Sequence, residues 1–255
     1  MSTNDILHEL IALSRHLGDP TNDYVILAEG NTAAWADEET FWVKASGVAL
    51  QGIEAGDFVR LRFAPVLAML NGPDLSDEQI RQALGAAKAN PETGAHPSVE
   101  TVLHALALGL PGVRFVGHTH PTAINALTCS LGFEAALSGR LFPDEIVVCG
   151  PAPAVVPYTD PGLPLARKVR EVIADHLQNH GEPPKVILMQ NHGLIALGRT
   201  AQEVENITAM AVKAARVLLG TAAFGGPHFL SVEAVQRIHT RLDELYRRAK
   251  FSRSQ

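Results

Sequence analysis

The stretch that decides how this chain folds is residues 113–121, which read Val113-Arg114-Phe115-Val116-Gly117-His118-Thr119-His120-Pro121. The apolar run at its start is typical of a buried β-strand, and the strand would end at two histidines. Alternate residues of a strand point to the same face, so His118 and His120 can present two imidazoles to one ion. Two nearby histidines are also common as ordinary polar residues, so the pair alone leaves both interpretations open.

A third histidine follows a second apolar run, Val186-Ile187-Leu188-Met189, within Gln190-Asn191-His192-Gly193. The run predicts another strand, which would place His192 near its end, as the first strand does for His118 and His120. Three neutral imidazoles at one point are the ligand set of a catalytic zinc site, which keeps a further position open for water or substrate. Imidazole ligands suit several divalent ions, so Zn²⁺, Mn²⁺ and Fe²⁺ are all candidates.

The composition predicts one large cytoplasmic domain. A chain of 255 residues with 46% hydrophobic content can bury one large core, and nothing in it forces a second domain. The formal charge of −6 and the absence of Lys/Arg runs in the body of the chain argue against nucleic acid or membrane as partner. No apolar stretch reaches the ~20 residues of a membrane span, and the first residues lack the basic segment of a signal peptide. Cys129 and Cys149 are expected to be free thiols in a reducing compartment.

Helices and strands alternate irregularly along the chain. Periodicity and end signals predict helices over 5–17, 77–89, 97–108, 163–180, 201–219 and 231–250. The helix over 201–219 opens on Thr200 and Glu203, the spacing of a capping box. Residues 32–35 and 40–43 predict two short strands joined by a polar turn, which is a β-hairpin. A layered α/β domain with antiparallel pairing therefore fits better than a purely parallel sheet.

Several other residues have both a structural and a chemical interpretation. Glu100 is expected in the first turn of the helix over 97–108, where the helix dipole favours a carboxylate. The alternative interpretation is that it faces the histidines and moves a proton. His104, one turn further on, is interpreted as an ordinary helix histidine. The pairs Gly30-Asn31 and Ser46-Gly47 could be plain turns or concave anion sites. Ser98 could cap a helix or bind an anion there.

The order and spacing of these residues resemble the class II aldolase/adducin family. The matching segments are Ala28-Glu29-Gly30-Asn31-Thr32, Lys44-Ala45-Ser46-Gly47, Pro97-Ser98-Val99-Glu100, Gly117-His118-Thr119-His120-Pro121 and Asn191-His192-Gly193. The resemblance covers residues 5–219. The forms of the second and third segments are also similar to the aldolase part of fused aldolase/short-chain dehydrogenase proteins. This chain has no glycine-rich dinucleotide motif for the other half of such a fusion.

The resemblance implies a fold, an assembly and a role for each residue. The fold is a three-layer α/β/α domain with a largely antiparallel sheet. It would span 1–255 as a single domain, with the helix over 231–250 as an appendage, in a homotetramer whose sites lie at subunit boundaries. His118, His120 and His192 would hold zinc. Glu100 would be the acid/base, able to ligate the metal when no substrate is present. The pocket for a substrate phosphate would be lined by Gly30, Asn31, Ser46, Gly47 and Ser98.

The implied activity is that of a zinc-dependent lyase of aldolase type. The metal would polarise a small sugar-like hydroxyketone and stabilise its enediolate when a carbon–carbon bond breaks. The same site would serve decarboxylation of an oxo acid, epimerisation or dehydration. An adducin-like binding module is disfavoured, because adducin lacks the metal histidines.

Two departures from the family pattern bear on the substrate. The phosphate-binding aldolases carry a second serine directly before the glutamate, and here Val99 stands in that place. They also use a tyrosine from a neighbouring subunit as a proton donor, whereas no tyrosine lies between Pro121 and Pro157 and Phe142 stands near the expected position. Tyr246 could take that role or be a core residue of the last helix. Whether the substrate carries a phosphate is therefore left open.

Overall fold

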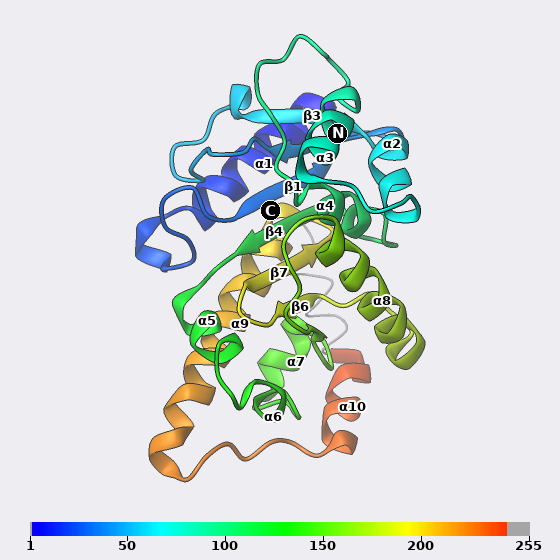
Figure 1. Cartoon of the computed structure of the whole chain (residues 1–255). Coiled ribbons are helices and arrows are strands. Elements are labelled where there is room, and N and C mark those ends of the chain that lie inside the picture. The colour runs from blue at the N-terminus through cyan, green and yellow to red at the C-terminus, as the bar shows by residue number, and fades with distance from the viewer. Residues whose placement is uncertain (1, 244–255) are drawn as a thin grey trace.

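A seven-stranded sheet forms the middle of the computed structural model, which describes residues 2–243 (Figure 1). Its strand order is β3-β2-β1-β4-β7-β6-β5. The strands are β1 (Asn31–Trp35), β2 (Thr40–Lys44), β3 (Phe58–Arg62), β4 (Phe115–Thr119), β5 (Ala154–Val156), β6 (Val186–Met189) and β7 (Gly193–Gly198). Every neighbouring pair is antiparallel except β5 with β6. The predicted hairpin is β1–β2, and the prediction of a layered α/β domain with a largely antiparallel sheet is confirmed.

Helices cover both faces of this sheet. They are α1 (Thr3–Leu17), α2 (Phe63–Ala68), α3 (Asp77–Ala86), α4 (Thr101–Leu108), α5 (Thr122–Thr128), α6 (Phe133–Ala136), α7 (Pro143–Cys149), α8 (Leu163–His180), α9 (Ala201–Thr221) and α10 (Val232–Thr240). The core on one face takes residues from α2, α3, α4 and α8. The core on the other takes them from α1, α5 and α9. The result is three layers, helix on sheet on helix.

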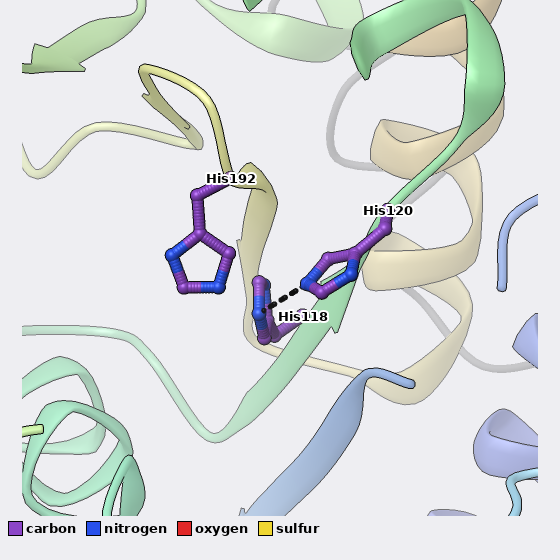
Figure 2. A group of neighbouring side chains, drawn as sticks. All are labelled: His118, His120 and His192. Carbon is purple, nitrogen blue, oxygen red and sulfur yellow. Dashed lines mark hydrogen bonds between the residues drawn. The ribbon is translucent and has the colours of Figure 1, made fainter. Parts of the chain in front are cut away.

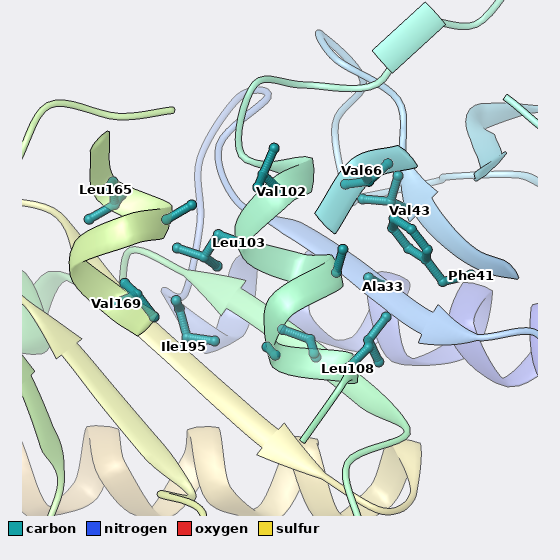
Figure 3. Packing of buried hydrophobic residues seen from close by; sticks show 14 of the residues in the cluster. Ala33, Phe41, Val43, Val66, Val102, Leu103, Leu108, Leu165, Val169 and Ile195 are labelled. Carbon is teal, nitrogen blue, oxygen red and sulfur yellow. The ribbon is translucent and has the colours of Figure 1, made fainter. Parts of the chain in front are cut away.

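Because both faces are covered, the central strands β4, β6 and β7 carry apolar residues on both faces rather than in strict alternation. Phe115 points into one core and Val116 into the other, and Leu194 and Ile195 divide in the same way. Figure 3 shows α4 lying between α8 and α2, with Leu103 and Leu108 over the sheet. Each such fully buried aliphatic side chain contributes about 1.5–3 kcal/mol relative to exposure. This packing holds α4, and with it Glu100 at its start, rigidly over β1 and β4.

Some predicted boundaries are wrong. The helix predicted over 97–108 begins at Thr101, because Pro97 pairs with Ala45 in a β-bridge and the chain then turns at Val99 and Glu100. In this turn Ser98 Oγ accepts from the Glu100 N–H at 3.3 Å. The helix predicted over 231–250 ends at Thr240, where Arg241 is extended (φ −62°, ψ 135°). Its remainder from residue 244 onward lies outside the described residues, as does Tyr246.

The predicted capping box of α9 is half formed. Thr200 Oγ1 accepts from the Glu203 N–H at 3.1 Å, as expected. Glu203 does not return the bond to Thr200. Its carboxylate instead accepts from the Arg199 N–H at 2.9 Å and from Nζ of Lys185, the residue directly before β6, at 2.8 Å.

Residues 201–224, α9 with the turn after it, are long and apolar enough to cross a membrane, with a hydropathy of 1.4. No such stretch was expected from the sequence. Of the most apolar 18-residue segment in this stretch, 33% is buried inside the chain. Val204, Ile207 and Val212 pack in the core beside the sheet. One helix of this length and composition is weak evidence for a membrane span.

Candidate metal and proton-transfer site

The sheet brings the three predicted ligands to one end of its central strands. His118 is in β4, opposite Asn31 of β1 and Ile195 of β7. His120 comes directly after β4, and its backbone N–H donates to the Tyr24 carbonyl at 2.9 Å. His192 lies in the tight turn from β6 to β7, in which Met189 pairs with Gly193. The two apolar runs of the sequence thus become strands, and both end at this site.

The imidazoles converge closely (Figure 2). One nitrogen from each of His118, His120 and His192 lies within 4.8 Å of the other two. The Nε2 atoms of His118 and His120 are 3.0 Å apart. The Nδ1–H of His118 can donate to the Leu194 carbonyl at 2.9 Å, which leaves its Nε2 lone pair directed at the other rings. This arrangement of nitrogen donors fits a divalent ion.

Burial keeps two of these rings neutral. It lowers the pKa of His118 to about 4. Burial, with the neighbouring His118 and His192, also lowers the pKa of His120 to about 4. A neutral imidazole is the form that binds a metal, so both rings are ready ligands at pH 7 without losing a proton.

Glu100 reaches the same point from the start of α4. Its Oε1 is 3.3 Å from His192 Nε2 and its Oε2 is 3.9 Å from His118 Nε2. Oε2 also accepts a hydrogen bond from Asn31 Nδ2 at 2.8 Å. Burial alone would raise the pKa of Glu100, but the two imidazoles and the Asn31 amide outweigh it and hold that pKa below its ordinary value. An ionised carboxylate therefore faces the histidine cluster.

Close packing requires the glycine directly before β1. Gly30 has φ +68°, and a Cβ there would lie 2.6 Å from the His118 carbonyl oxygen. Any side chain would therefore separate β1 from β4 at the site. Asn31 follows directly, and it is 6% exposed with both ends of its amide engaged by Glu100 and His104.

The other residues predicted to line the substrate pocket come from two adjacent segments. A bridge pairs Ala45 with Pro97, and the Ser46 N–H donates to the His96 carbonyl at 2.8 Å. This places the Ser46-Gly47 turn beside the segment that holds Ser98. Gly47 has φ +77°, and a Cβ added to it would meet no atom within 4 Å, so it serves the turn and leaves open space. Val99 packs against the hydrophobic core, and its side chain has no hydrogen-bond donor for a ligand.

Lys44 is a site residue that was not predicted from the sequence. It is 3% exposed, and its Nζ donates to the Val48 carbonyl at 2.5 Å and to the Ala28 carbonyl at 3.3 Å. These bonds tie the segment before Gly30 to the Ser46-Gly47 turn. Burial lowers the pKa of Lys44 to about 8, against the opposing effect of Glu100. Its place at the end of a strand, two residues before a Ser-Gly turn, is the signal that could have identified it.

Most of the chain matches one known protein family. Residues 8–219 match the model of a family described as Class II Aldolase and Adducin N-terminal domain.

Among curated proteins, the chain is 30% identical over 181 residues to Uncharacterized oxidoreductase YuxG of Bacillus subtilis, covering 68% of this chain and 24% of that protein. It is 31% identical over 116 residues to 3-oxo-tetronate 4-phosphate decarboxylase of Escherichia coli, covering 45% of this chain and 51% of that protein. It is 34% identical over 134 residues to Methylthioribulose-1-phosphate dehydratase of Geobacillus kaustophilus, covering 51% of this chain and 61% of that protein. The chain therefore spans less than two thirds of the length of each of these relatives.

Solved structures show the same fold. The N-terminal class II aldolase domain of a conserved protein from Thermoplasma acidophilum superposes with a TM-score of 0.64 at 28% identity, covering 83% of this chain and 92% of that one. An L-fuculose 1-phosphate aldolase superposes with a TM-score of 0.69 at 19% identity, covering 94% and 96%.

Proposed function

The chain belongs to the class II aldolase and adducin family, and we propose that it is a metal-dependent lyase that breaks or forms a carbon–carbon bond in a small sugar-like hydroxyketone. One observation carries this proposal. Three imidazole nitrogens lie within 4.8 Å of one another, and a carboxylate oxygen of Glu100 stands 3.3 Å from one of those rings. A ligand cluster with an adjacent acid/base is the minimum that such chemistry needs.

His118, His120 and His192 would hold the ion, for which zinc, manganese and iron all suit the donor set. When bound, a divalent ion supplies the positive charge that polarises a carbonyl and offsets the negative charge left on the substrate by bond cleavage. Glu100 Oε1 is the atom that would take and return the proton. The Asn31 N–H on Oε2 leaves Oε1 as the oxygen that faces the His192 side of the cluster.

The substrate would carry an anionic group, a phosphate or a carboxylate. Lys44 Nζ uses two of its three hydrogens on backbone carbonyls and forms no ion pair among the described residues. The third hydrogen, the Ser46-Gly47 turn and Ser98 could together bind such a group. Val99 stands where a second hydroxyl residue could have donated a hydrogen bond. We therefore expect this pocket to make fewer hydrogen bonds to the anionic group.

Decarboxylation of an oxo acid is the second candidate. The curated relatives that this chain matches over part of its length include a decarboxylase and a dehydratase. Aldol cleavage also needs a second proton-transfer group at the departing aldehyde, and Phe142, near the position expected for it, cannot transfer a proton. Loss of carbon dioxide from an oxo acid needs no such group. Epimerisation and dehydration would use the same cluster and Glu100.

A matched pair of variants tests the proposal. Glu100→Gln should bind metal as the unaltered protein does and lose turnover, because the amide cannot accept the proton. Glu78→Gln is the control, because the Glu78 side chain of α3 is exposed, and this variant should keep both metal binding and turnover. Phosphorylated and free hydroxyketones and oxo acids would be assayed for aldehyde release and carbon dioxide release. Near-normal turnover by Glu100→Gln would refute the acid/base role, and the product released would decide between the two candidates.

We further infer a cytoplasmic homotetramer with its sites at subunit boundaries. Size-exclusion chromatography with light scattering tests the assembly, and a monomeric mass with full activity would refute it.

A further inference from the structure

His104 is a buried histidine that the proposed chemistry does not use. It lies in α4, one turn after Glu100, and its backbone N–H donates to the Glu100 carbonyl at 3.2 Å. The residue is 0% exposed. Its Nε2 forms a short hydrogen bond with Asn31 Oδ1, and its Nδ1 has no hydrogen-bond partner among the described residues. A buried polar atom without a partner costs free energy, so a histidine is less favourable here than an apolar side chain of the same size would be.

Asn31 stands between this histidine and the carboxylate. Its Oδ1 faces His104, and its Nδ2 donates to Glu100 Oε2 at 2.8 Å. The β1–β4 ladder fixes its backbone opposite His118. An amide side chain has one accepting end and one donating end, so whichever partner decides the direction of one end also decides the other.

The protonation of His104 follows from its surroundings. Burial lowers the pKa of His104 to about 4, so the ring is neutral at pH 7 and carries a single N–H. Asn31 Oδ1 can only accept a hydrogen bond. The single N–H must therefore be on Nε2, and the partnerless Nδ1 carries the lone pair.

We infer that His104 is a positioning residue, which donates from Nε2 to Asn31 Oδ1 and thereby fixes the Asn31 amide with its N–H groups toward Glu100. With the amide reversed, Oδ1 would face the Glu100 carboxylate, two acceptors would repel each other, and Oε2 would lose its donor. One Nδ2 hydrogen is used in this way, which leaves the other for a ligand. The consequence for turnover rests on the proposed function, whereas the hydrogen-bond chain itself does not.

Two substitutions separate positioning from packing. His104→Leu fills a similar volume and has no donor, whereas His104→Gln offers an amide N–H at similar reach. In His104→Leu we expect unchanged metal content and a fall in kcat of about 10–100-fold, the usual cost of losing an outer partner of a site residue, with KM within about twofold. His104→Gln should recover most of that loss. His176→Leu is the control for removal of a buried histidine elsewhere, in α8, and should leave kcat unchanged.

Nuclear magnetic resonance tests the inference without any substrate. Long-range ¹H–¹⁵N spectra of the metal-loaded protein should show His104 as the Nε2–H tautomer between pH 6 and 8. The side-chain amide protons of Asn31 should exchange slowly with solvent, and exchange should quicken in His104→Leu but not in His176→Leu. An Nδ1–H tautomer, or Asn31 exchange that His104→Leu leaves unchanged, would overturn the inference. If no substrate is turned over, the proposed function fails while these spectra still decide the role of His104.

Discussion

Substituting Gly193 by alanine should weaken metal binding through a single methyl group. Gly193 is the first residue of β7 and directly follows His192. An added Cβ would lie 2.6 Å from the Thr119 carbonyl oxygen, 2.7 Å from His120 Cδ2 and 3.5 Å from His118 Cε1. Contacts under 3.0 Å require movement. The carbonyl belongs to β4, which the ladder with β7 holds in place, so the His120 ring is the part that can yield.

The size of the effect follows from this crowding. Forcing an extra carbon into a packed region costs about 1–3 kcal/mol. If that cost is met by displacing one ligand ring, the metal dissociation constant should rise by about 10–100-fold, since each tenfold change corresponds to about 1.4 kcal/mol.

A competition titration against a zinc-binding dye measures this change. Gly56→Ala is the matched control, because a Cβ there has nothing within 4 Å, and it should bind zinc as the unaltered protein does. A Gly193→Ala protein with zinc affinity within about twofold of the unaltered protein would refute the placement of β7 against His120.

Three further predictions concern stability. Arg140→Leu should lower the free energy of unfolding by about 3–5 kcal/mol in urea, because it leaves Glu145 buried without its 2.8 Å ion-pair partner; a loss under about 1 kcal/mol would contradict this. Gly85→Ala in α3 should raise the free energy of unfolding by about 0.5–1 kcal/mol, because alanine has a higher helix propensity than glycine and its methyl group would meet no atom within 4 Å. A decrease would show that the position is crowded. Burial lowers the pKa of His104 and His118 to about 4. The unfolded chain then binds more protons than the folded one below pH ~6.5, so thermal unfolding of metal-free protein should shift downward as pH falls toward 4. A midpoint constant over this range would contradict the burial of neutral imidazoles.

The strands at the site were predictable because their sequence is apolar on both faces. The runs before His118 and around Leu188 have no polar alternation, which is typical of strands covered by helices on both sides. The strand β7 was not predicted, although it pairs with both of them. Its apolar run is only four residues long, Leu194 to Leu197, and a glycine bounds it at each end, Gly193 and Gly198. They are there because neighbouring atoms leave no room for a Cβ.

The convergence of His118, His120 and His192 could be predicted from the sequence, and the residues around them could not. Histidines at the ends of two apolar runs are visible locally. Burial of Lys44 and the contact between Asn31 and His104 are not, because that contact joins residues 73 positions apart and exists only once α4 lies over β1. The role of Glu100 was open from sequence, since a carboxylate at a helix start has a structural reason of its own. The structure adds that its oxygens face His192 and Asn31.

The proposed chemistry depends above all on His118, His120 and His192 forming a metal site. The most direct test is the metal content of untagged, dialysed protein by inductively coupled plasma mass spectrometry, with His118→Ala and the control His176→Ala measured alongside. We expect about one divalent ion per chain in the unaltered protein and the control, and its loss in His118→Ala. Protein that holds no metal and takes none up when zinc is added would contradict the assignment.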